Sequence, residues 1–117
     1  MDTDKQTKAA EHKEYMQKTE QELSGLLKQK RELSQKKESL FDNKRKISTL
    51  LNDTIADMRG YEDLDEIRDL ERINGIMQSE FRHFEHMYEE EYKSIEANRK
   101  KIELGREEEV RKYKRQN

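Results

Sequence analysis

Apolar residues recur at seven-residue intervals in both halves of the chain. The repeat in the first half consists of Leu26, Leu33, Leu40 and Ile47, accompanied by Leu23, Leu51 and Met58 at the neighbouring heptad position. The repeat in the second half consists of Ile67, Phe81, Tyr88, Ile95 and Ile102, accompanied by Leu70, Met77 and Phe84, with Asn74 in its gap. Such spacings place apolar side chains along one stripe of a helix, whereas a disordered chain has no such period. The pattern therefore predicts two long α-helices.

The two series do not share one phase, and the break between them falls at Gly60. Continuing the first series beyond Met58 would lead to Asp65, whereas the apolar series restarts at Ile67. Acidic residues crowd just after the break, where negative charge stabilises the first turn of a helix. We therefore expect an all-α fold, an antiparallel two-helix coiled-coil hairpin. The expected elements are a helix over about residues 4–58, a turn over 59–62 and a helix over 63–114, in one domain of residues 1–117.

Lysines at seam positions of the first half favour this hairpin over a parallel dimer. In a parallel dimer Lys30, Lys37 and Lys44 would each face their own copy, and like charges at a seam cost stability. A continuous rod without a turn is the alternative architecture.

The position of the turn predicts which residues face each other across the hairpin. The expected pairs are Leu40 with Phe81, Lys30 with Glu91, Lys37 with Phe84 and Lys44 with Met77. A lysine stem covers an apolar side chain while its ammonium group reaches water, so these pairs are compatible with a seam.

Further apolar residues lie beside the seam, on a flank that the two helices share. The members of this expected stripe are Leu27, Phe41 and Ile55 of the first helix, and Leu64 and Tyr92 of the second. The opposite flank adds only Leu50, Ile73 and Met87. A one-sided apolar stripe on a thin molecule is typical of a binding face. We expect it to complete a four-helix bundle, with a second copy as a homodimer or with another helical protein; the alternative is that these residues merely broaden the seam.

Composition limits the function further. Apolar residues make up 30% of the chain and charged residues 44%, with a mean hydropathy of −1.43. This is too little apolar material for a core in which a catalytic site is buried, so we do not expect an enzyme. No apolar run is long enough for a transmembrane helix or a signal peptide, so we expect no membrane insertion and a cytoplasmic location, with export alongside a partner left open.

Candidate chemistry is sparse. Glu80-Phe81-Arg82-His83 matches the Glu-x-x-His motif of di-iron bundles, but the chain has no second copy of it, and His83 and His86 fall at outward heptad positions. We expect no metal, cofactor or small-molecule substrate. A net charge of −2 argues against a nucleic-acid partner, and the basic residues of the segment 99–115 suit a helix C-terminus.

A helical hairpin that turns at a central glycine resembles the WXG-type small proteins of type VII secretion. Arg59-Gly60-Tyr61 stands where those proteins carry Trp-x-Gly, and the high charge is similar to that of the α-helical proteins that accompany LXG toxins in Gram-positive bacteria. This resemblance implies a targeting factor or chaperone that binds the LXG domain of a toxin exported by the type VIIb machine. Tyr92 and Glu96 have the spacing of a Tyr-x-x-x-Asp/Glu export motif, which is a weak signal in so acidic a chain.

Two other classes remain open on the sequence alone. A coiled-coil stalk or chaperone of a flagellar or type III system uses a similar charged hairpin and binds an ATPase or an export gate. A structural coiled coil would associate only with itself.

Overall fold

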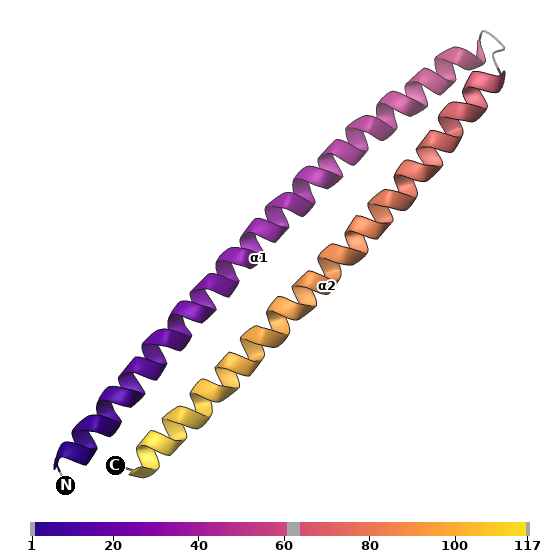
Figure 1. Ribbon diagram of the computed structural model, residues 1–117. Helices are drawn as coiled ribbons and strands as arrows, with labels where there is room; N and C mark the ends of the chain where they lie inside the picture. The colour runs from indigo at the N-terminus through magenta and orange to yellow at the C-terminus, as the bar shows by residue number, and fades with distance from the viewer. Residues whose placement is uncertain (1, 61–63, 117) are drawn as a thin grey trace. The chain divides into compact units, whose positions relative to one another are not determined.

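The structure, a computed structural model, describes residues 2–60 and 64–116. Helix α1 spans Asp2–Arg59 and helix α2 spans Leu64–Gln116, so the prediction of two long helices is confirmed (Figure 1). Within these described ranges there is no strand. Part of the expected turn and the expected first residue of the second helix lie at residues 61–63, outside the described residues.

The helix ends follow the chemistry of the chain. No proline interrupts either helix. Asp65 and Glu66 lie in the first turn of α2 and Lys114 and Arg115 in its last turn, and each pair has the sign of charge that the helix dipole favours. At the end of α1, the Gly60 amide donates to the Asp57 carbonyl oxygen at 3.3 Å.

The chain forms two compact units. The terminal unit comprises the residues up to Glu32 together with those from Tyr92, and the turn unit comprises Leu33–Glu91. In each unit, a segment of α1 lies beside a segment of α2 that runs in the opposite direction (Figure 1).

One line of covered side chains on each helix forms the seam of the turn unit. Its members, buried or half-buried, are Leu33, Lys37, Leu40, Lys44, Ser48, Leu51, Ile55 and Met58 of α1, and Ile67, Leu70, Asn74, Met77, Phe81, Glu85 and Tyr88 of α2. Successive seam residues are alternately three and four residues apart along each helix. This alternation is interrupted at 40–44–48 in α1 and at 77–81–85 in α2, where two spacings of four follow each other. Such an insertion locally unwinds a coiled coil, so some of the seam positions beyond it are displaced by one residue.

This shift corrects three sequence-based placements. Ile47 and Phe84, expected in the seam, are 42% and 41% exposed. Ile55, expected on an exposed flank, is only 7% exposed and lies in the seam. A strict seven-residue repeat does not follow the 3.6-residue turn of a straight helix, and the two steps of four residues absorb the difference.

The register of the turn unit is also displaced from the expected one. The Lys44 ammonium lies 5.7 Å from the centre of the Phe81 ring, four residues beyond the expected Met77. The Lys37 ammonium lies 5.7 Å from the ring of Phe41 on its own helix. The expected pairing is therefore wrong by about one helical turn. The end of α1 at Arg59 and the start of α2 at Leu64 lie one residue later than expected, in the same direction as this displacement.

The seam of the terminal unit combines polar side chains with half-buried apolar ones, among them Leu23, Leu26, Ile95 and Ile102. The His12 ring stacks on the Tyr113 ring with centres 4.1 Å apart, and its Nδ1 lies 3.2 Å from a Glu109 carboxylate oxygen. Thr19 is 5% exposed, and its hydroxyl donates to the Tyr15 carbonyl oxygen at 2.8 Å. The His12 contacts join α1 to α2, whereas the Thr19 hydrogen bond lies within α1.

Arginine takes the place of smaller residues in this part of α2. The expected seam position Asn98 is exposed, whereas its neighbour Arg99 is half-buried, as is Arg106. A long arginine stem can be covered while its guanidinium group reaches polar partners. Arg106 Nη1 is nevertheless buried without a hydrogen-bond partner among the described residues.

Asn74 offers a test of the seam. Its side-chain oxygen is buried with no hydrogen-bond partner among the described residues. We expect Asn74→Leu to raise the free energy of unfolding by about 1–2 kcal/mol, because it removes an unsatisfied acceptor and adds apolar burial. Urea denaturation measures this change. The matched control Asn52→Leu, at an exposed position of α1, should change stability by no more than about 0.5 kcal/mol. A destabilised Asn74→Leu variant would contradict the assigned seam.

Candidate protein-binding surface

Seven large apolar side chains are exposed among the described residues of the turn unit, and we call six of them, all except Leu64, the apolar flank. Its members are Ile47, Leu50, Ile73, Ile76, Phe84 and Met87, which are 41–67% exposed. Each of them directly precedes a seam residue of its own helix. Leu50, for example, precedes Leu51, and Ile76 precedes Met77.

This common position places all six side chains on one face of the turn unit. A step back of one residue rotates a helix position by about 100° from the seam, in the same sense on both helices. Because the two helices are antiparallel, the same sense of rotation leads to the same face of the pair. The exposed apolar side chains of α1 and α2 therefore adjoin each other.

The other flank of the turn unit is polar by comparison. Residues that directly follow seam residues are Ser34, Glu38, Phe41, Arg45, Thr49, Asn52, Ala56 and Arg59 of α1, and Arg68, Glu71, Gly75, Gln78, Arg82, His86 and Glu89 of α2. Phe41 is half-buried, and the ammonium groups of Lys37 and Lys44 lie 5.7 and 5.9 Å from its ring centre. The two flanks of the turn unit thus differ sharply in apolar surface.

The residues of the expected stripe are dispersed. Leu27 in the terminal unit and Leu64 in the turn unit are exposed, and Phe41 and Tyr92 are half-buried. With Ile55 in the seam, only Phe41 and Leu64 of this set remain accessible in the turn unit. Their role in partner binding stays a prediction.

Sequence reasoning named three members of the apolar flank and missed three. It placed Leu50, Ile73 and Met87 there as a minor surface, and it missed Ile47, Ile76 and Phe84. One feature of the sequence indicated that Phe84 does not belong to the seam. After Phe84, its seven-residue series would have continued with glutamate, asparagine and glycine, which are polar or small.

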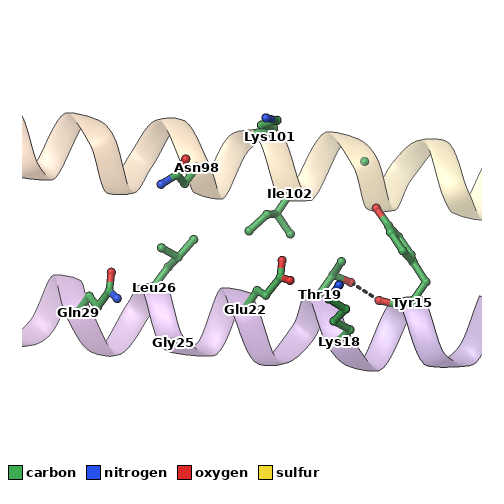
Figure 2. Close-up of a pocket in the computed structure, with 11 residues that line it drawn as sticks. Tyr15, Lys18, Thr19, Glu22, Gly25, Leu26, Gln29, Asn98, Lys101 and Ile102 are labelled. Carbon is green, nitrogen blue, oxygen red and sulfur yellow. Dashed lines mark hydrogen bonds between the residues drawn. The ribbon is translucent and has the colours of Figure 1, made fainter.

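A groove of about 650 Å³ lies in the terminal unit (Figure 2). Small residues line part of this groove, among them Gly25, Thr19 and Gly105. The Tyr15 side chain reaches from α1 toward α2, and its hydroxyl lies 2.8 Å from where a side-chain carbon on Gly105 would stand (Figure 2). Nothing lies within 4 Å of the same position on Gly25.

Four charged side chains form a network in the terminal unit. The Lys30 ammonium donates to one Glu96 carboxylate oxygen at 3.0 Å, and the Arg99 guanidinium donates to the other at 2.8 Å. Arg99 also donates to Glu103 at 2.9 Å. The expected partner of Lys30 was Glu91, so the structure corrects that pair.

The network shifts the ionisation of its members. The hydrogen bond from Arg99, and next the one from Lys30, lower the pKa of Glu96 from 4.5 to about 2. The pKa of Arg99 is raised by its hydrogen bonds to Glu96 and Glu103. Glu96 and Tyr92 are the two residues of the expected export motif. Glu96 is held by Lys30 and Arg99, and Tyr92 is half-buried.

The described residues contain no group of three or more His, Cys, Asp or Glu side chains that could hold a metal ion. His83 and His86 are both exposed. Neither α1 nor α2, over its described length, contains a segment long and apolar enough to cross a membrane.

No known protein family matches this chain, and no curated protein or solved structure is similar to it. Its own surfaces and charges therefore carry the functional inference.

The contact between Tyr15 and Gly105 gives a stability prediction. Gly25→Ala should raise the free energy of unfolding by about 0.5–1 kcal/mol, because alanine favours a helix and the space there is open. Gly105→Ala should gain less, since the Tyr15 hydroxyl must move. In a Tyr15→Phe background, Gly105→Ala should regain the full increase. Denaturation of the wild type, the two single variants Gly105→Ala and Tyr15→Phe, and the double variant completes a double-mutant cycle. Equal effects of Gly105→Ala in both backgrounds would exclude the contact.

The Glu96 network predicts a dependence of stability on acid. Because folding lowers the pKa of Glu96, its contribution to stability is present above pH 4.5 and is lost as the pH falls from 4.5 toward 2. Glu96→Gln should lower the melting temperature at pH 7 and flatten the decline over this acid range. Thermal melts at several pH values measure both effects. Glu20→Gln, at an exposed position of the same unit, should keep the wild-type profile; identical profiles for the two variants would disprove the role of the network.

Proposed function

We propose that this chain is a non-catalytic protein-binding partner that completes a helical bundle with another helical protein. The observation that carries the proposal is the apolar flank, six exposed apolar side chains on one face of the turn unit. Each Å² of apolar surface that a partner removes from water contributes about 25 cal/mol. The described parts of α1 and α2 leave these side chains exposed to solvent.

The partner we propose is the LXG domain of a toxin exported by type VIIb secretion, with this chain as its targeting factor or chaperone in the cytoplasm. The resemblance to the small helical proteins that accompany such toxins supports this choice. Two long helices of similar length, α1 and α2, are compatible with it. Such a partner would lay amphipathic helices along the apolar flank and complete a four-helix bundle.

The test is recovery of the complex from the native cell with the tagged full-length chain, followed by its mass and stoichiometry. We expect one LXG-type protein in a defined ratio. The double variant Leu50→Asp with Ile76→Asp should lose this protein, because each change places a charge at the centre of the apolar flank. Circular dichroism should show unchanged helix content, since both side chains are exposed.

Two control variants distinguish the flank from other apolar surface. Leu104→Asp changes an equally exposed leucine of the terminal unit and should keep the partner. The pair Leu27→Glu with Phe41→Glu probes the stripe expected from the sequence. Loss of the partner in this pair alone would move the interface to that stripe. Recovery of an ATPase or export-gate component would instead assign the chain to the stalk class, and recovery of the chain alone would leave a self-associating coiled coil.

A further inference from the structure

The apolar flank has charged neighbours on the same face, and most of them are acidic. Positions that directly precede seam residues of the turn unit also include Asp57, Glu66, Asp69 and Glu80, against the single basic residue Lys36. The uncharged Ser39, Asn43 and Thr54 also lie at such positions. Asp69 lies 3.7 Å from Arg72 in an exposed pair on its own helix. The apolar side chains are thus bordered by negative charge along α2 and near the turn.

The opposite flank of the turn unit has the reverse balance. Positions that follow seam residues include Arg45, Arg59, Arg68 and Arg82 against Glu38, Glu71 and Glu89. The face with exposed apolar surface is therefore also the face with excess negative charge.

This combination disfavours a second copy of the chain as the occupant of the apolar flank. Two copies joined through this face would bring two acidic borders together, and like charges across an interface cost binding energy. An apolar stripe with a basic border would instead gain from both the burial and the charge.

We propose that the apolar flank binds an amphipathic helix of another protein whose apolar stripe is bordered by Lys and Arg. This inference rests on the proposed function and specifies the chemistry of the partner surface. Complementary charge raises the rate of association and selects the partner, while burial of Leu50, Ile76 and their neighbours supplies most of the affinity. Added salt weakens the complex, because the charged border is exposed to solvent.

The experiment uses the full-length chain and two synthetic peptides of about 20 residues, long enough to form a helix. Both peptides carry the same leucine stripe, bordered by Lys in one and by Glu in the other. Fluorescence anisotropy measures the two dissociation constants. We expect the Lys-bordered peptide to bind at least tenfold more tightly, with an advantage that shrinks as salt is added.

Variants of the chain link this preference to the apolar flank. Asp69→Lys with Glu80→Lys should reverse the preference for the two peptides. The control Glu38→Lys with Glu89→Lys makes the same change of net charge on the opposite flank and should retain the preference. Leu50→Asp with Ile76→Asp should weaken binding of the Lys-bordered peptide at least tenfold.

The outcomes separate this inference from the proposed function. Equal binding of the two peptides, abolished by Leu50→Asp with Ile76→Asp, would overturn the charge inference and leave the protein-binding role intact. A dimer of the chain at micromolar concentration that the same double variant dissociates would overturn it in favour of a second copy. If neither peptide binds and the native complex survives that double variant, the apolar flank is not an interface and both proposals fail.

Discussion

The packing of one narrow seam between two antiparallel helices is the constraint on which the other features of this structure depend. Among the apolar residues that the structure describes, only Leu33, Ile55 and Ile67 are buried, so little apolar surface is enclosed. A single seam can cover only one stripe of each helix, and the side chains beside it remain in water. Which residues lie in the seam therefore also decides which apolar residues are left for a partner.

The sequence was sufficient for the elements but not for their register. A chain without proline and with sustained heptads can form little other than long helices, and α1 and α2 end within a few residues of the expected bounds. Beyond Lys44 in α1 and Phe81 in α2 the prediction failed at Ile47 and Phe84, because a heptad count assumes one period throughout. The expected seam residues Leu51, Met58 and Tyr88 are half-buried and lie in the seam. The apolar positions do not reveal an extra spacing of four residues, because the helix continues whether Ile47 or Ser48 lies in the seam.

The same shift accounts for part of the difference between the exposed apolar surface and the expected stripe. It moves Ile55 into the seam and leaves Ile47 and Phe84 outside it. The acidic border directly precedes Met58, Ile67, Leu70 and Phe81, so the heptad pattern alone already placed it on this face. In the terminal unit, the Lys30–Glu96–Arg99 network adds specificity of pairing to the partial burial of apolar side chains.

The most direct test is the accessibility of single cysteines, since the natural chain contains none. Variants Ile47→Cys and Phe84→Cys place a thiol on the apolar flank, and Ile55→Cys places one in the seam. The rate of alkylation by iodoacetamide, with helix content checked for each variant, measures exposure. We predict at least tenfold faster reaction at positions 47 and 84 than at 55. Fast reaction at 55 and slow reaction at 47 would restore the strict heptad seam and contradict the assignment of the apolar flank.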